Sequence, residues 1–307
     1  MLFSIQKELF DILPDLTIGM AVAKDVDNTR PSKEIDDLLT RAVGEMRKNF
    51  IGDKAQDHPR IKPWRASFSK LGISGSKFPS SIESMARRVL KGDPFPKINP
   101  LVDLYNSVSL RFLVPMGGHD LDTIEGNIHL KFTEGWEPFT PMGGGETGVV
   151  PKGELVYCDD REVLTRNWVW RQCEKDKATE KTKNIFIPVD VLAEVGRERA
   201  DEIILELSQL IPRYLGGTVF SAVLTREKPS VDLNDHEFFS KIVKMAFSKR
   251  RKTLLNNLRG LQLMGYSGRD IDLALQDSGI DGMKRGETLT VEELGRLSNS
   301  LCSREIP

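Results

Sequence analysis

The sequence predicts an α+β domain over residues 1–225, followed by a small all-α domain over residues 226–307. Up to about residue 225, amphipathic helical stripes flank a β-rich stretch of short apolar runs that Gly and Pro interrupt. The segment Glu227 to Asp235 is polar and contains Pro229, which is typical of a linker between domains. The residues after this segment follow helical patterns throughout.

The first domain opens with Phe3 to Leu13, which mixes helix and strand periods, so its structure stays open. A helix is expected from Ser32 to about Phe50, because Ser32 is a good capping residue and the apolar residues after it share one stripe. After a polar loop from Gly52 to Pro63, a second helix is expected from Ser81 to Leu90, closed by a glycine.

Short apolar runs between Leu101 and Asp190 are predicted to form the strands of this domain. These runs are Ile128–Phe132, Leu155–Tyr157, Val163–Val169 and Asn184–Val189. A helix from Ala193 to Leu210 and a last strand from Val219 to Leu224 complete it. In the second domain, Gly-bearing turns join four expected helices, at His236–Phe247, Lys252–Leu261, Ser267–Asp277 and Val291–Leu301.

A net charge of −1 conceals a local excess of positive charge, because Lys241 to Gly260 holds seven basic residues and no acidic one. We therefore expect a polyanion to bind there. The three cysteines, Cys158, Cys173 and Cys302, are odd in number and show no paired metal spacing. This pattern predicts a reducing compartment, no metal and no cofactor. The apolar run at the N-terminus is too short to span a membrane and contains acidic residues, so we expect a cytoplasmic protein without a membrane partner.

Four blocks in the first domain form a recognisable series along the chain. They are INPLVDLYNSVSL (Ile98–Leu110, followed by Pro115), HDLDTIEGNI (His119–Ile128), GELVYCDD (Gly153–Asp160) and EKDKATEKTKNIFI (Glu174–Ile187). In this order the blocks resemble the B3/B4 domain, the editing domain of the bacterial phenylalanyl-tRNA synthetase β subunit. The resemblance covers roughly residues 60 to 190, and the flanking helices suit the free-standing relatives of that domain.

This resemblance implies hydrolysis of the ester that joins a wrong amino acid to tRNA, by a protein acting in trans. Glu174 stands where the editing family has the glutamate that recognises a hydroxyl on the noncognate side chain. The alternative is a solvated surface glutamate beside Lys175 and Lys177. An aminoacyl ester is already activated, so a site that binds the tRNA end and positions a water is sufficient.

Gly117 occupies the position of the family's histidine, and the nearest histidine here lies two positions later at His119. His119 is therefore a candidate catalytic residue or an ordinary, partly buried histidine. Gly117 and Gly118 are candidates for bringing backbone amides close to the substrate. Trp168, Trp170 and Arg171 sit on a predicted strand, where the two tryptophans share one face. Trp170 and Arg171 are further substrate-binding candidates, although a tryptophan at such a position more commonly packs in the core.

The second domain resembles the C-terminal domain of ribosomal RNA adenine dimethyltransferases. The similarity lies in FFSKIVKMAFSKRRKTLLNNLRGL (Phe238–Leu261) and RGETLTVEELGRLSN (Arg285–Asn299). A glycine-rich S-adenosylmethionine loop and an Asn-Leu-Pro-Tyr-like catalytic run are not found in the sequence, so we do not expect methyl transfer. An annotation carried over from this region alone would mislead.

The basic run Lys249, Arg250, Arg251 and Lys252, together with Arg259, predicts RNA contacts through phosphates. The expected partners are aminoacylated tRNA and ribosomal RNA. Besides an editing hydrolase, the sequence allows a non-catalytic tRNA- or rRNA-binding or ribosome-associated factor in which the first domain keeps only its fold. A man-made fusion of two unrelated domains is a third interpretation.

Overall fold

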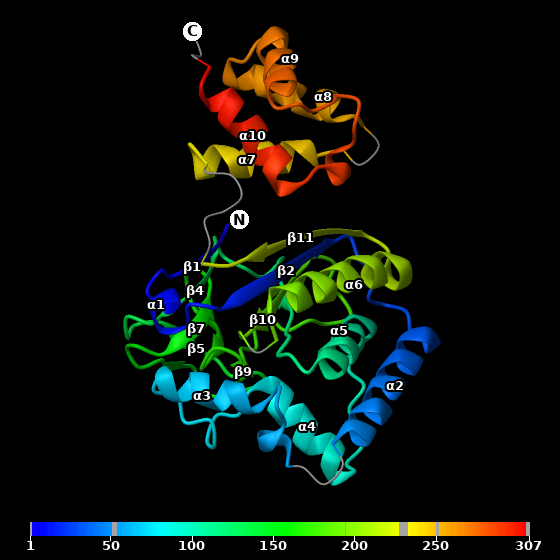
Figure 1. Ribbon diagram of the computed structural model, residues 1–307, viewed down its shortest axis with the longest axis vertical. Coiled ribbons are helices and arrows are strands. Elements are labelled where there is room, and N and C mark those ends of the chain that lie inside the picture. Colours follow the sequence, from blue (N-terminus) through cyan, green and yellow to red (C-terminus); the bar gives the residue numbers. More distant parts are fainter. Residues whose placement is uncertain (1, 51–53, 194, 227–232, 250–251, 305–307) are drawn as a thin grey trace. The chain divides into compact units, whose positions relative to one another are not determined.

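The computed structural model describes residues 2–50, 54–193, 195–226, 233–249 and 252–304. The chain divides into two compact units, Met1–Arg226 and Glu227–Pro307, which we call the first and the second unit (Figure 1). Within the described residues, all strands belong to the first unit, and the second unit contains helices only. The fold is thus α+β, as the sequence predicts. Pro229 and its neighbours in 227–232 lie outside the described residues.

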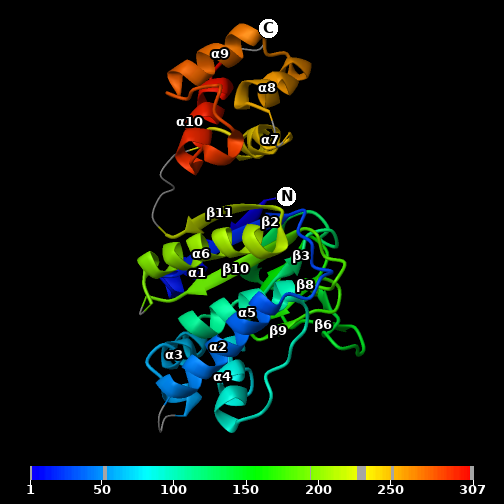
Figure 2. The same ribbon diagram turned by 90° about the vertical axis from the view of Figure 1, so that its right-hand side faces the viewer.

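One half of the first unit is built on a four-stranded antiparallel sheet. In spatial order its strands are β11 (Thr218–Leu224), β2 (Thr17–Lys24), β10 (Ile185–Val191) and β3 (His119–Asp120). Helix α6 (Arg197–Leu215) lies along β2 in both ribbon views (Figures 1 and 2). The two elements pack very closely at Gly19, where an added Cβ would lie 2.7 Å from Cγ1 of Ile204. Only glycine permits this approach.

The other half of the first unit contains a five-stranded sheet. In spatial order its strands are β1 (Phe3–Ile5), β4 (Ile128–Phe132), β7 (Leu155–Cys158), β8 (Val163–Arg166) and β9 (Arg171–Gln172). The pair β1 and β4 is parallel, and the other neighbours are antiparallel. A separate hairpin pairs β5 (Pro138–Phe139) with β6 (Gly148–Val149). The segment from Phe3 to Leu13, which mixes helix and strand periods, contains both a strand and a helix, since α1 (Leu9–Ile12) comes soon after β1.

Four longer helices pack beside these sheets: α2 (Lys33–Asn49), α3 (Lys62–Lys70), α4 (Ser81–Lys91) and α5 (Pro100–Phe112). The expected cap of α2 is present, since the Ser32 hydroxyl accepts a hydrogen bond from the amide of Ile35 at 3.3 Å. Helix α4 ends, as predicted, at Gly92, which takes a left-handed conformation with φ 79°. The helix predicted from Ala193 to Leu210 is shifted along the chain and forms α6.

Three predictions for the first unit are wrong. The polar loop predicted up to Pro63 contains the 3₁₀ turn η1 (Ala55–Asp57) and the start of α3. Helix α5 was not predicted and lies at the start of the stretch expected to be β-rich, because ten of its 13 residues are buried and it shows no one-sided stripe. The strand predicted over Val163–Val169 ends at Arg166, since Asn167 and Trp168 take φ values of 44° and 64°. Positive φ at two successive residues interrupts a strand.

The second unit is a small helical bundle. Its helices are α7 (His236–Ala246), α8 (Leu254–Leu258), α9 (Gly268–Asp277) and α10 (Val291–Cys302), with 3₁₀ segments η2 (Arg259–Met264) and η3 (Gly286–Thr288). The single helix predicted over Lys252–Leu261 is divided between α8 and η2. A core that includes Ile242, Leu258 and Leu297 holds the bundle together. Across the described part of the chain, no helix combines the length and apolar character needed to cross a membrane.

Candidate functional site

The imidazole of His119 is directed into the protein rather than toward solvent. Strand β3 is held by β10, with His119 opposite Phe186, and only 2% of His119 is exposed. Its Nδ1 contacts the Oδ2 of Asp176, a fully buried carboxylate whose Oδ1 accepts a hydrogen bond from Gln172 Nε2 at 3.1 Å. This contact connects β3 to the segment 172–177.

Glu174 lies at the surface end of the same segment. Its Oε2 accepts a hydrogen bond from the amide of Gly143 at 2.8 Å, and its Oε1 pairs with Lys177 Nζ. The Lys177 ammonium, followed by the Gly143 amide, lowers the pKa of Glu174 below its usual value. About a third of the side chain, 36%, is exposed. Glu174 is therefore an ionised acceptor that a ligand can reach.

A glycine loop, Gly143–Gly145, lies beside this carboxylate and joins β5 to β6. Its three residues have φ values of 93°, 87° and 141°, which side-chain-bearing residues rarely adopt. The backbone amide of Glu174 donates to the carbonyl of Thr140, just before the loop, at 2.9 Å. Glu174 is therefore bonded to this part of the chain through both its backbone and its side chain. Backbone amides of such a loop suit an anion or a polarised carbonyl oxygen.

The predicted neighbours of Glu174 come together only in part. The backbone of Lys177 pairs with that of His119, and Gln172 Nε2 donates to the carbonyl of Gly118 at 2.7 Å. Gly117 and Gly118 immediately precede β3, and Gly118 is bonded to the segment 172–177. No hydrogen bond connects the imidazole of His119 with the carboxylate of Glu174 within the described residues, and the two groups have separate partners.

The two glycines differ in the space around them. A Cβ at Gly117 would meet no heavy atom within 4 Å, whereas one at Gly118 would lie 2.6 Å from Cδ1 of Ile185. Gly118 is thus required for packing against β10. The open space at Gly117 is where the resemblance places the editing family's histidine.

Arg171 and Trp170 occupy different surroundings. Arg171 is exposed on β9, and its Nη2 donates to the carbonyl of Met142, the residue before the glycine loop, at 3.4 Å. Trp170 belongs to a turn instead of the predicted strand, and its half-buried ring packs edge-on against Phe78 with 4.5 Å between ring centroids. Trp168, predicted to share a strand face with Trp170, is fully buried.

The sequence did not predict two pairings that define this site. Lys177, expected only as a neighbour of a solvated Glu174, forms an ion pair with it, and the opposite charges three residues apart were the available signal. Asp176 holds His119, but no local pattern indicates that two residues 57 positions apart are bonded.

Burial raises the pKa of Cys158 to about 12, so this thiol is protonated and is a poor nucleophile at neutral pH.

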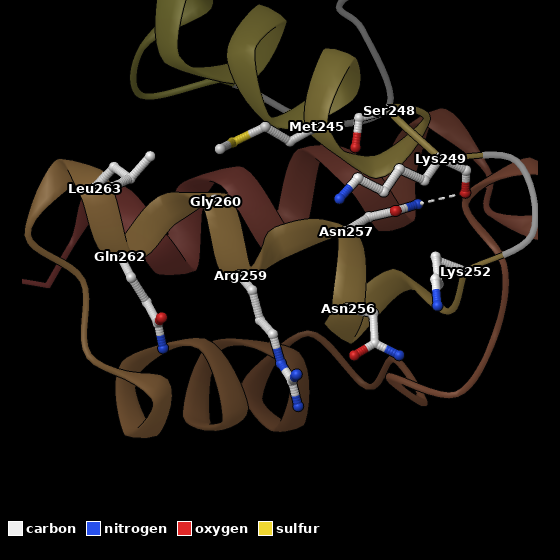
Figure 3. Close-up of a pocket in the computed structure, with 10 residues that line it drawn as sticks. All are labelled: Met245, Ser248, Lys249, Lys252, Asn256, Asn257, Arg259, Gly260, Gln262 and Leu263. Carbon is white, nitrogen blue, oxygen red and sulfur yellow. Dashed lines mark hydrogen bonds between the residues drawn. The ribbon is translucent and has the colours of Figure 1, made fainter.

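The second unit carries a distinct hollow, which we call the basic groove. It has a volume of about 590 Å³ and lies along the α8–η2 segment, between Met245 and Ser248 at the end of α7 and Gln262 and Leu263 (Figure 3). Its cations are Lys249, Lys252 and Arg259, all exposed, and none has an ion-pair partner within the part of the chain that the structure describes. Arg250 and Arg251, predicted RNA contacts, lie outside the described residues.

Asn257 maintains the shape of the groove. Its Nδ2 donates to the carbonyl of Ala246, the last residue of α7, at 2.7 Å and to that of Lys249 at 3.3 Å. The carbonyls at the end of a helix lack partners within the helix, so this amide acts as a cap. Lys249 is thereby fixed at its backbone, while its side chain remains free to reach a ligand.

Comparison with known proteins agrees with the division of the chain into two units. Residues 64–209 match the B3/4 domain family. The C-terminal region is 44% identical over 75 residues to the ribosomal RNA small subunit methyltransferase A of Clostridium acetobutylicum, a match that covers 24% of this chain and 26% of that protein. It is 45% identical over 87 residues to the protein of the same name from Bacillus pumilus, covering 27% and 30%. The chain thus spans about a quarter of the length of these relatives.

Among solved structures, the chain is similar to an N-terminal fragment of the phenylalanyl-tRNA synthetase β subunit from Pyrococcus horikoshii. The match covers 78% of this chain and 59% of that fragment, with a TM-score of 0.36 and 14% identity. Residues 64–209 are thus similar to the B3/4 domain family, and the second unit is similar to part of an rRNA methyltransferase.

Proposed function

We propose that this protein binds RNA through the basic groove of its second unit. The observation that carries the proposal is the set of three exposed cations without ion-pair partners among the described residues. Lysine and arginine side chains in such a group neutralise phosphates and release counterions. The relatives that share this region are named for ribosomal RNA, and the B3/4 match in the first unit supports RNA binding in the same chain.

This proposal is tested by titrating the full chain with labelled tRNA and with a fragment of small-subunit ribosomal RNA at several salt concentrations. The affinity is expected to fall steeply as salt rises, with a logarithmic slope of about −0.7 to −0.9 per phosphate contact. Affinity that does not change with salt, or no binding at all, would contradict the proposal.

We further propose that the first unit hydrolyses the ester of misacylated tRNA. Glu174, ionised and reachable, accepts a hydrogen bond from a polar group on the noncognate amino acid, while amides of the glycine loop or of Gly117 and Gly118 stabilise the developing oxyanion. A water attacks the carbonyl carbon, the bond to the ribose oxygen breaks, and that oxygen takes up a proton. Free amino acid and uncharged tRNA are released.

His119 acts in this scheme as a positioning residue. Its contact with Asp176 holds the segment that carries Glu174 against β3. Because the lowered pKa of Glu174 makes its carboxylate a weak base, we assign it to substrate recognition rather than to proton abstraction.

The competing function is a non-catalytic RNA-binding factor. It is favoured by the burial of His119. It is also favoured because Glu174 already has two partners, Lys177 and Gly143, which a substrate would have to displace or share. A panel of aminoacylated tRNAs separates the two functions. Faster ester loss than the spontaneous rate for at least one aminoacyl group supports the hydrolase, and spontaneous rates throughout, with RNA binding intact, support the binding factor. No methyl transfer from labelled S-adenosylmethionine is expected in either case.

A further inference from the structure

One polar atom in the basic groove has no partner. Asn257 is 6% exposed, and its Oδ1 is buried without a hydrogen bond in the described structure. The orientation of the amide is determined, because Nδ2 donates to the carbonyls of Ala246 and Lys249 and an exchange of N and O would oppose oxygen to oxygen. A buried acceptor without a hydrogen bond is costly, so a donor supplied by a ligand would stabilise Oδ1.

The walls of the groove indicate which donor fits. Met245 and Leu263 provide an apolar side, and Leu263 is unusual because 94% of it is exposed. Gly260 permits this arrangement, since an added Cβ would lie 2.7 Å from Cε of Met245. Figure 3 shows Lys252, Asn256 and Arg259 extending together on the opposite side of the α8–η2 segment. The groove thus combines an apolar wall, a buried acceptor and a cationic edge.

A nucleobase attached to a phosphate backbone matches all three features. A base has flat apolar faces, an edge that bears N–H groups, and phosphates on either side. The volume of about 590 Å³ lies within the range of small-ligand sites. A base paired in a duplex does not fit, because its N–H edge is already occupied and its faces are stacked.

We propose that the basic groove holds one unpaired, unstacked nucleobase of an RNA, with an N–H of the base donating to Asn257 Oδ1 and flanking phosphates on Lys249, Lys252 and Arg259. The inference rests on the proposed RNA binding and adds the class of ligand: a single-stranded segment instead of a uniform duplex.

The test compares ligands that have equal charge but differ in their bases. The full chain is titrated with a single-stranded oligocytidine of about twelve nucleotides, within the span that such sites cover, and with the same backbone made abasic. We expect the intact strand to bind roughly tenfold more tightly, because insertion of a base beside an apolar wall contributes beyond the phosphates. Leu263→Ala should reduce this ratio, and Met283→Ala, at another exposed apolar residue of the second unit, should not.

The outcomes separate this inference from RNA binding itself. Equal, salt-dependent affinity for intact and abasic strands would overturn the base site and leave RNA binding in place. No binding to either strand would overturn both. Equal affinity for polyglutamate and the oligocytidine would show that only charge is recognised, which also overturns the base site. Because Leu263 is almost fully exposed, its truncation should leave the fold intact, and circular dichroism checks this point.

Discussion

Lys175 in the first unit lies within 3.0 Å of carboxylate oxygens of Glu125, Asp159 and Glu162. The three cations of the basic groove in the second unit, by contrast, have no such partner within the residues described. The interiors of the two units also differ, because the first unit buries several carboxylates and the described part of the second unit buries none. A charge that is neutralised within the fold contributes to structure, whereas an unpaired surface charge is available to a ligand.

The largest expected effect comes from reversing the unpaired charges. The combined change of Lys249, Lys252 and Arg259 to Glu should weaken RNA binding at least about a hundredfold, because each phosphate contact is a charge-assisted hydrogen bond that contributes roughly 1.5 to 3 kcal/mol. Fluorescence anisotropy with labelled tRNA measures the loss.

A matched control reverses three exposed lysines of the first unit, Lys62, Lys70 and Lys91, which have no ion pair in the described structure. The total charge then changes by the same amount. If the control weakens binding as much as the groove variant does, net charge and not the groove is responsible, and the contrast between the units disappears.

The second prediction concerns a buried carboxylate of the first unit. Asp190 Oδ1 accepts hydrogen bonds from Tyr157 and from Trp168, each at 2.8 Å, yet burial raises its pKa to about 6. A folded-state pKa above the unfolded value means that stability is fully present below about pH 4 and is lost as pH rises toward about 6.

Asp190→Asn keeps the acceptor and removes the titration. The free energy of unfolding of the variant, minus that of the native chain, should therefore increase by about 2 kcal/mol between pH 4 and pH 6.5. Denaturant titrations followed by tryptophan fluorescence report on the first unit alone, because all four tryptophans of the chain lie in it. A difference that does not depend on pH would show that the pKa of Asp190 in the folded protein is not raised above its unfolded value.

The third prediction sharpens the assignment of Glu174. Glu174→Ala should reduce discrimination between hydroxyl-bearing and purely apolar aminoacyl groups by about tenfold or more, since a lost hydrogen bond to a charged partner costs roughly 1.5 to 3 kcal/mol. Deacylation rates on the two substrate classes measure it. Glu180→Ala, at an exposed glutamate nearby, is the control and should change neither rate. Equal losses on both classes would assign Glu174 to the general hydrolytic machinery.

The smallest effect is expected at the two adjacent glycines. Gly118→Ala should cost about 1 to 3 kcal/mol of unfolding free energy, because the new methyl group would collide with Ile185. Gly117→Ala should remain within about 0.5 kcal/mol of the native chain, since its surroundings are open. Similar values for both would show that β10 moves to accommodate a side chain.

Local features of the chain are what the sequence determined by itself. Ser32 starts α2 and Gly92 ends α4, because capping and a left-handed C-terminus depend on neighbours a few residues away. The same holds for the basic run after α7, whose charge density is visible without a structure. The two resemblances were also readable, since each depends on consecutive blocks of residues.

The tertiary structure alone decided which distant groups meet. Helix α5 is buried on almost all sides, so its sequence shows no stripe that distinguishes it from strands. His119 and Asp176 are 57 residues apart, and Asn257 acquires its free acceptor only because α8 packs against the end of α7. Periodicity and capping act over a few residues, whereas these contacts depend on how the whole chain brings its elements together.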